Sequence, residues 1–282
     1  EFRRVLFRSP TEILPTHTPE LLARAVDRAA ELLCRGEVVV VPTETVYGLA
    51  ANAFNPDAVA RIFQIKGRPA HNPIIVHVAS SPMAQECAAG WPKLGTKLAG
   101  AFWPGPLTLV VPRSERIPDI VTANGNTVGI RWPQHPFMQA VIQKCGFPLA
   151  APSANLSNQI SPTNTNHVLR QLRDRVPLLI DGGDCNVGIE STVVDVTGAL
   201  PRVLRPGVIS EPALLAAAGM PGDRSIGFTH GSSSESGQLR SPGLLARHYC
   251  PKAQVRILKW ADEPSLRSEE HTSELQSHHD LV

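Results

Sequence analysis

Short apolar runs with the character of β-strands alternate along this chain with amphipathic runs that have the period of an α-helix. The first predicted helix and the strand after it show this alternation most clearly. Thr18 and Pro19 are typical of a helix start, Gly36 of a helix end, and the β-branched run Val38–Val41 of a buried strand. Alternation this close predicts an α/β or mixed α+β domain, in which helices flank a twisted open sheet.

The same periodicities predict the other elements. We expect further strands at Ile74–Val78, Leu107–Val111, Val128–Arg131, Leu178–Ile180, Thr192–Val196 and Arg202–Leu204. We expect further helices from Asn55 through Phe63 and at Lys93–Phe102, Pro136–Cys145, Asn164–Arg173 and Glu211–Ala217. The segment Gly222–Gly243 is rich in Ser and Gly, which indicates a flexible linker.

The two ends of the chain are related to each other. Glu1–Ser9 and Arg267–Leu275 can be encoded by the two strands of one DNA segment, as a sequencing adapter on both sides of an insert would be. We therefore expect residues 1–9 and 267–282 to be adapter-derived, and they are left out of the fold. The histidines within the second segment then indicate no metal site.

Composition excludes several classes of protein. With 282 residues and 42% hydrophobic content, the chain can bury a substantial core. A net charge of +2 with 5% aromatic residues is not typical of a nucleic-acid-binding module. The apolar runs are too short to span a bilayer and no signal-peptide pattern is visible, so we expect a cytoplasmic protein without a membrane partner. The five cysteines form no C-x-x-C pair, which argues against a zinc or disulfide framework.

Polar segments interrupt the apolar pattern, mostly directly after predicted strands. Because loops at strand ends of such sheets usually hold ligands, we expect these segments to converge on one large central cleft. No standard phosphate-binding loop is present: Gly183–Gly188 has the spacing, but Ile189 stands where the lysine must be. The segments are Pro42–Gly48, Lys66–Pro69, Asn72–Pro73, Arg131–Pro133, Ala151–Asn155, Ser161–Thr163 and Ser191–Thr192.

The residue types indicate what this cleft could hold. Lys66 and Arg68 on a Gly-Pro loop suit a polyphosphate, and Arg131 suits a carboxylate. His77 at a strand end could donate to a substrate hydroxyl or carboxylate, or be a satisfied structural residue. Hydroxyls suited to orienting small polar groups come from Thr45, Ser153, Ser161 and Ser191.

Six motifs in order resemble the YrdC family of threonylcarbamoyl-AMP synthases. They are Pro-Thr-Glu-Thr-Val-Tyr-Gly-Leu, Lys-Gly-Arg-Pro with Asn-Pro, Trp-Pro-Gly-Pro-Leu-Thr, Val-Gly-Ile-Arg-Trp-Pro, Ala-Pro-Ser-Ala-Asn-x-Ser and Glu-Ser-Thr-Val-Val-Asp. The resemblance runs from about Leu14 to Ala218. It implies a YrdC-like catalytic domain over residues 10–221, an interdomain linker at 222–251, and the start of a truncated Rossmann-like domain at 252–266.

The resemblance also implies roles for individual residues. L-threonine would be contacted by Thr45, His77, Arg131, the backbone of Ala151, and Ser191. ATP would be contacted by Arg68, Asn72, Thr127, Ser153, Ser161 and Arg205, with Lys66 and Arg68 as the catalytic charges. Arg247, His248 and Tyr249 look like linker residues that close over the nucleotide. No acidic pair stands out as a metal cage, so Mg²⁺ would bind through the ATP phosphates.

The implied reaction joins L-threonine, bicarbonate and ATP into threonylcarbamoyl-AMP and releases pyrophosphate. A downstream threonylcarbamoyl transferase complex would then use this adenylate on the adenosine beside the tRNA anticodon, so tRNA would be an indirect or weak partner. Two alternatives stay open: a tRNA or double-stranded RNA binding module, and the carbamoyl-adenylating YrdC-like domain of hydrogenase maturation proteins. Asn158 departs from the family pattern, which usually has glycine there.

Overall fold

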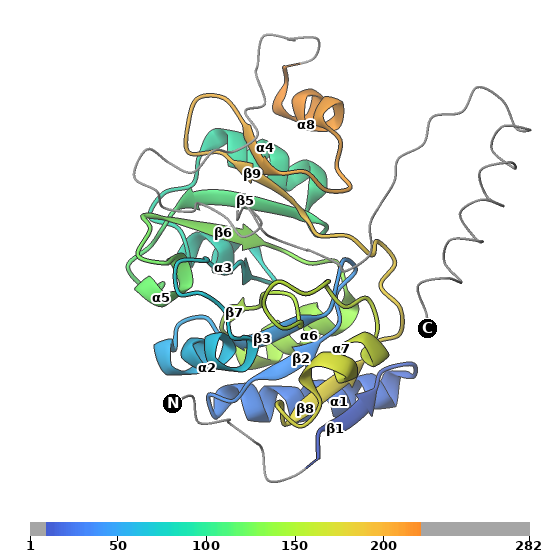
Figure 1. Cartoon of the computed structure of the whole chain (residues 1–282). Helices are drawn as coiled ribbons and strands as arrows, with labels where there is room; N and C mark the ends of the chain where they lie inside the picture. The colour runs from blue at the N-terminus through green and yellow to red at the C-terminus, as the bar shows by residue number, and fades with distance from the viewer. Residues whose placement is uncertain (1–9, 221–282) are drawn as a thin grey trace, which may run out of the picture. The chain divides into compact units, whose positions relative to one another are not determined.

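The computed structural model describes residues 10–220. The predicted linker at 222–251, the start of a second domain at 252–266 and both expected adapter ends lie outside the described residues. In the part that is described, ten strands form one sheet in the order β1-β8-β2-β3-β7-β4-β6-β5-β9-β10 (Figure 1). Within that part, no helix is long and apolar enough to cross a membrane.

The elements follow the alternation that the sequence predicts. The strands are β1 (Glu12–Pro15), β2 (Val39–Val41), β3 (Gly48–Asn52), β4 (Val76–His77), β5 (Leu107–Pro112), β6 (Thr127–Arg131), β7 (Leu149–Ala150), β8 (Leu178–Asp181), β9 (Thr192–Asp195) and β10 (Arg202–Arg205). The helices are α1 (Pro19–Cys34), α2 (Pro56–Lys66), α3 (Ser81–Glu86), α4 (Lys93–Phe102), α5 (Asp119–Thr122), α6 (Pro136–Cys145), α7 (Thr165–Leu172) and α8 (Glu211–Ala218).

The strand pairing is mixed, which confirms the predicted fold class. Parallel pairs are β1 with β8, β2 with β8, β4 with β6, and β5 with β9, and the remaining neighbours are antiparallel. Strand β3 joins the two halves, because Gly48–Ala50 pair with β2 whereas Ala51 and Asn52 pair with β7. The sequence did not predict β3, since Gly-Leu-Ala-Ala-Asn lacks the β-branched residues that mark a strand.

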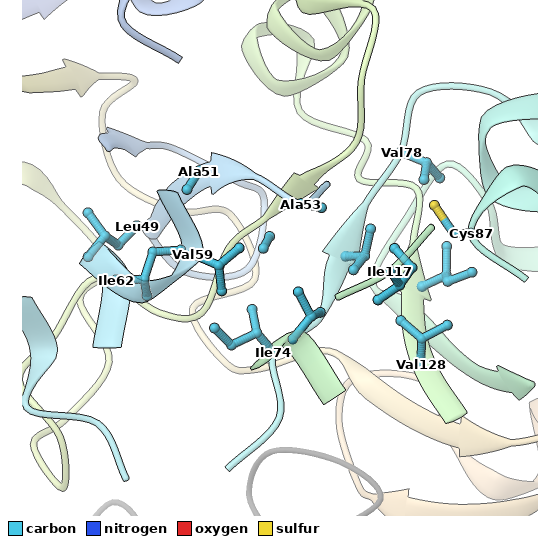
Figure 2. Packing of buried hydrophobic residues seen from close by; sticks show 14 of the residues in the cluster. Leu49, Ala51, Ala53, Val59, Ile62, Ile74, Val78, Cys87, Ile117 and Val128 are labelled. Carbon is cyan, nitrogen blue, oxygen red and sulfur yellow. The ribbon is translucent and has the colours of Figure 1, made fainter. Parts of the chain in front are cut away.

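One face of the sheet packs against helices and forms the largest buried cluster with them. Leu49 and Ala51 of β3 belong to the same buried cluster as Val59 and Ile62 of α2 (Figure 2). Residues of α4, α5 and α8 complete this cluster. Because strand side chains alternate between faces, Val39, Val41 and Ala50 point the other way, and they share a second buried cluster with α1 and α6.

That second face is covered only in part by the described helices. Its other half carries a small apolar cluster made of strand residues and Ile75, without a helical member. On the same half, Thr108 of β5 and Arg131 of β6 lie opposite each other in register, beside the Leu109 and Ile130 pair that faces the large core. Polar side chains therefore gather on the half of this face whose apolar cluster has no helical member.

Hydrogen bonds of Tyr47 connect the loops around this half-face. Its ring is fully buried, and its hydroxyl donates to the Gly183 carbonyl at 2.7 Å and accepts from the Gly182 N–H at 3.1 Å. Its backbone N–H also donates to the Pro162 carbonyl at 2.9 Å. Gly182 has to be glycine, because a Cβ there would lie 2.6 Å from Pro42 Cβ.

Removing this hydroxyl tests how strongly the loops depend on it. Tyr47→Phe keeps the buried ring but leaves a backbone donor and a backbone acceptor unpaired, so we expect a loss of about 1–3 kcal/mol in the free energy of unfolding. Urea unfolding followed by circular dichroism measures the loss. An unchanged midpoint would show that water satisfies both backbone groups.

Candidate active site

A pocket lies on the half of the sheet face that no described helix covers, where loops from both halves of the sheet meet. Five of the seven segments that the sequence predicts to converge on one cleft contribute to its lining, and Asn72–Pro73 and Ser161–Thr163 do not. The lining residues are Thr43, Thr45, Val46, Gly48, Arg68, Ile75, His77, Arg131, Ala151, Pro152, Ser153, Glu190, Ser191 and Arg205.

The pocket gathers most of the candidate site residues, although not all of them. Those in the lining are Thr45, Arg68, His77, Arg131, Ala151, Ser153, Ser191 and Arg205. Lys66, Asn72 and Ser161 are not part of the lining, but each forms a hydrogen bond with a lining residue. Thr127 lines a neighbouring cavity of about 250 Å³, which shares Ile75 with the pocket. Arg247, His248 and Tyr249 lie outside the described residues.

Arg131 ends β6 with its guanidinium buried among polar groups. Its Nη1 donates to Thr45 Oγ1 at 2.9 Å, its Nε donates to the Gly105 carbonyl at 3.3 Å, and its Nη2 lies 2.6 Å from Glu44 Oε1. Arg131 is 3% exposed and Glu44 is 6% exposed. Burial raises the pKa of Glu44, but the charge and the hydrogen bond of Arg131 outweigh burial and hold that pKa below its usual value.

One buried polar atom of the lining, His77 Nδ1, makes no hydrogen bond among the described residues. Arg131 Nη2 is instead engaged by its ion pair with Glu44. Buried polar atoms are normally paired, so a polar ligand in the pocket would account for His77 Nδ1. Burial, together with the charge of Arg131, lowers the pKa of His77 to about 3, which keeps its ring neutral at physiological pH.

Arg68 is positioned by the end of α2. The helix ends at Gly67 in the left-handed conformation, with φ 58°, and the chain turns sharply there. The guanidinium of Arg68 donates to Asn72 Oδ1 at 2.8 Å and to the carbonyls of Asn72 at 3.1 Å and Pro73 at 2.6 Å. In this structure Asn72 therefore orients Arg68 and does not itself line the pocket.

Lys66 differs from the simple expectation of a charge facing the phosphates. It is 2% exposed, and its ammonium donates to the carbonyls of Ser153 at 2.6 Å and of Asn155. Burial and the nearby charge of Arg68 lower its pKa well below the usual range. Lys66 thus holds the loop that presents Ala151 and Ser153, and a contact with phosphate stays a prediction.

The 151–158 loop also explains the departure noted at Asn158. The Asn155 side chain donates to the carbonyls of Leu156 at 2.8 Å and Gln159 at 2.7 Å, which closes the loop on itself. Asn158 adopts φ 65°, a conformation that favours glycine but that asparagine tolerates better than most residues. The replacement of the usual glycine is therefore compatible with the backbone found here.

A third polar group lies at the start of β9 and the end of β10. Arg205 donates to Ser191 Oγ at 3.0 Å and to the Ser191 carbonyl at 3.1 Å, and Ser191 Oγ lies 2.8 Å from Thr108 Oγ1. Ser161 donates to Glu190 Oε1 at 2.8 Å, and Glu190 Oε2 lies 3.5 Å from Arg205 Nη2. These contacts place one cationic group, Arg205, and the hydroxyls of Ser161 and Ser191 beside Glu190.

The charge of the pocket favours an anionic ligand. Its lining contains three arginines and, among the described residues, a single carboxylate, Glu190. No group of three His, Cys, Asp or Glu side chains that could hold a metal ion occurs within residues 10–220.

Reasoning from the sequence missed two acidic residues of this site, Glu44 and Glu190. Both lie inside quoted motifs, directly beside candidate residues, but neither was singled out, because a carboxylate does not suggest an anion-binding role. A buried arginine normally requires a counter-charge, and this rule is the signal that would have directed attention to Glu44.

Breaking the buried ion pair should be costly. Glu44→Gln leaves Arg131 buried without a compensating charge, so we expect a loss of about 3–5 kcal/mol in the free energy of unfolding at neutral pH. Urea unfolding measures it. Glu31→Gln is the matched control, because Glu31 pairs with Arg28 and Arg35 on the exposed surface of α1. Equal losses in the two variants would contradict a special role for the buried pair.

The neutral state of His77 should appear in the pH dependence of stability. Unfolded His77 titrates near its ordinary value of 6.5 and the folded residue near 3, so between these values only the unfolded state takes up the proton. The contribution of neutral His77 to the free energy of unfolding is therefore fully present above pH 6.5 and decreases as the pH is lowered.

The free energy of unfolding should fall between about pH 7.5 and about pH 5. We expect this fall to be smaller in His77→Gln, by up to about 2 kcal/mol. Urea unfolding of both proteins at both pH values measures the difference. His135, whose pKa is also lowered by burial, is present in both proteins and cancels. Identical losses would show that His77 is protonated in the folded protein.

Comparison with known proteins supports one family. The sequence profile of the Sua5/YciO/YrdC family, described as "Telomere recombination", matches residues 31–207. A threonylcarbamoyl-AMP synthase of Bacillus subtilis (strain 168) is 41% identical over 258 residues, which are 91% of this chain and 72% of the relative. A threonylcarbamoyl-AMP synthase of Pyrococcus abyssi (strain GE5 / Orsay) is 42% identical over 231 residues, which are 82% of this chain and 67% of the relative.

A solved structure agrees with these sequence matches. The crystal structure of P. abyssi Sua5 complexed with L-threonine superposes with a TM-score of 0.82 at 36% identity, and the match covers 96% of this chain and 78% of that chain. The family profile spans more than half of the chain, and five of the six motifs contribute residues to the pocket lining. Gly105 and Thr108 of the remaining motif contact the lining residues Arg131 and Ser191. The chain therefore belongs to the Sua5/YciO/YrdC family.

Proposed function

We propose that this chain synthesises L-threonylcarbamoyl-AMP from L-threonine, bicarbonate and ATP, with release of pyrophosphate. The observation that carries the proposal is one pocket whose lining combines Arg131, bonded to Thr45, and His77 with two further arginines, Arg68 and Arg205. We treat the first three residues as one region of the pocket and the two further arginines as another. The names of the relatives at 41% and 42% identity support the same activity.

The region around Arg131 suits an amino acid. An arginine can bind a carboxylate through its N–H donors, and Arg131 lines the pocket beside Thr45. Thr45 Oγ1 beside it and the neutral ring of His77 can bind hydroxyl or carboxylate oxygens. We assign the threonine to this region, with the Ala151 backbone and Ser191 as its further contacts. L-threonine in the solved relative supports the assignment.

The region around Arg68 and Arg205 suits a triphosphate. Two guanidinium groups and the hydroxyls of Ser153 and Ser161 are groups that bind phosphate oxygens. We assign ATP to this region, with Asn72 orienting Arg68. We also assign Thr127, which lines a small neighbouring cavity, to the nucleotide.

The proposed chemistry has two steps. The amine of threonine attacks carbon dioxide and releases a proton, or attacks bicarbonate with loss of water, and in either case becomes a carbamate. A carbamate oxygen then forms a bond to the α-phosphorus of ATP, while the bond to the bridging oxygen breaks and pyrophosphate leaves. No side chain has to form a covalent bond, so the protein acts by holding the carbamate in line and by stabilising the charge that develops on the leaving group.

Particular residues would carry out this work. Arg131 fixes the carboxylate and thereby the direction of the amine, and Arg68 and Arg205 stabilise the phosphates. Lys66 contributes through the loop that it holds, and through its charge if that charge is retained with nucleotide bound. Mg²⁺ bound to the phosphates would neutralise further negative charge on the leaving pyrophosphate. A downstream transferase complex that acts on tRNA would consume the adenylate.

Release of pyrophosphate tests this proposal. The full chain is incubated with ATP, Mg²⁺ and bicarbonate, with and without L-threonine, and we expect release that depends on threonine. Arg131→Ala should raise the KM for threonine at least about 100-fold, because a charge-assisted bidentate contact is lost. Arg68→Ala should instead raise the KM for ATP and lower kcat.

Arg61→Ala is the matched control. Arg61 lies on α2, pairs with Glu37 and is not part of the pocket lining. It should leave both KM values unchanged. Release without threonine, or equal dependence on serine and threonine, would overturn the substrate assignment. If Arg131→Ala unfolds, Thr45→Val keeps the ion pair and tests the same region.

A further inference from the structure

Glu190 is a carboxylate in a pocket otherwise charged for anions. It lies between β8 and β9, directly before Ser191, and its side chain is 20% exposed. Among the described residues, the other charged residues of the pocket lining are Arg68, Arg131 and Arg205. A negative side chain here repels the same ligands that the three arginines attract, so its presence needs a physical explanation.

The contacts of Glu190 show which groups it uses. Its Oε1 accepts a hydrogen bond from Ser161 Oγ at 2.8 Å, and its Oε2 lies 3.5 Å from Arg205 Nη2. Its charge also acts on buried Lys66, whose pKa it raises against the stronger effects of burial and Arg68. Ser161, Arg205 and Lys66 are three of the groups that we assign to ATP.

A carboxylate and a phosphate compete for such groups because they present similar oxygen acceptors. The hydroxyl of Ser161 can donate one hydrogen bond at a time, so it cannot serve Glu190 and a phosphate oxygen together. A phosphate that binds there must either replace the Glu190 carboxylate or accept its repulsion. Both reduce the affinity of the pocket for polyphosphates.

We propose that Glu190 is an internal competitor for the phosphate subsite of Ser161 and Arg205, and that it weakens the binding of ATP and pyrophosphate. The proposal rests on the proposed function in one respect, namely that the ligand of this subsite is a polyphosphate. Its consequence is kinetic. A phosphate region with two arginines, Arg68 and Arg205, would release pyrophosphate slowly, and a carboxylate that returns to Ser161 and Arg205 favours its departure.

Two other roles for Glu190 predict the opposite result. If the carboxylate bound Mg²⁺ together with the phosphates, its removal would weaken the binding of magnesium pyrophosphate. If it only held Ser161 and Arg205 in place, its removal would misplace both groups and again weaken binding. The sign of the change in affinity therefore distinguishes competition from either alternative.

Calorimetric titration of the full chain with pyrophosphate, with and without Mg²⁺, measures this sign. Glu190→Gln keeps the side-chain shape and an oxygen acceptor for Ser161 but removes the charge. We expect pyrophosphate to bind about five- to twentyfold more tightly, because one partly exposed unit charge within a few Å is lost. In single-turnover assays, pyrophosphate should also leave the variant more slowly.

Controls separate this effect from others. Glu37→Gln removes a carboxylate that pairs with Arg61 outside the pocket and should leave the affinity unchanged. Ser161→Ala should weaken binding, since a donor to phosphate is lost. Binding of L-threonine, measured with each variant, reports whether the pocket is folded. If Glu190→Gln does not fold, Glu190→Asp shortens the reach to Ser161 and should tighten binding to a smaller extent.

Each outcome is decisive. Tighter binding by Glu190→Gln with unchanged affinity for threonine supports the proposal. Equal or weaker binding by a folded variant overturns it and leaves the proposed function intact. Failure of pyrophosphate and ATP to bind even the unmodified chain overturns the assignment of the subsite to a polyphosphate, and the competitor role falls with it.

Discussion

The buried pair of Arg131 and Glu44 joins the two halves of the sheet at the pocket. Arg131 ends β6 in one half, whereas Glu44 lies in the turn between β2 and β3 in the other. Two charges buried this deeply stabilise a protein only if each remains compensated, so the two halves have to keep their relative position. The same contact fixes the guanidinium that we assign to the substrate carboxylate, and stability and recognition therefore depend on one interaction.

Around this pair, the protein assembles a cationic pocket from groups that it also uses internally. Arg68 is held by Asn72, Arg205 by Ser191, and Lys66 by the carbonyls of the loop after β7. Each cation is thereby pre-oriented, which reduces the ordering that ligand binding would otherwise require. Pre-orientation also carries the risk of excessive affinity for a product, and a carboxylate among these cations opposes it.

The sequence predicted most of the elements because local chemistry determines them. Thr18, Asn55 and Asn164 cap helices α1, α2 and α7 as their positions indicate, and each cap bonds to a backbone N–H of its first turn. Strand β3 escaped prediction because Gly-Leu-Ala-Ala-Asn pairs for reasons of tertiary contact. Strand β4 is limited to Val76–His77, since the N–H of Ile74 bonds to the Val121 carbonyl outside the ladder.

The sequence by itself determined the alternating architecture, the family and the set of loops that meet at the pocket, because periodicity, capping and motif order are properties of neighbouring residues. Only the tertiary structure decided what the polar groups do with one another. It turned Lys66 toward the carbonyls of Ser153 and Asn155, and it brought Glu44 to Arg131 and Glu190 to Ser161 and Arg205. The physical reason is that a buried charge is satisfied by whichever partner the fold brings within a few Å, and residues 15 or more positions apart give no local sign of that meeting.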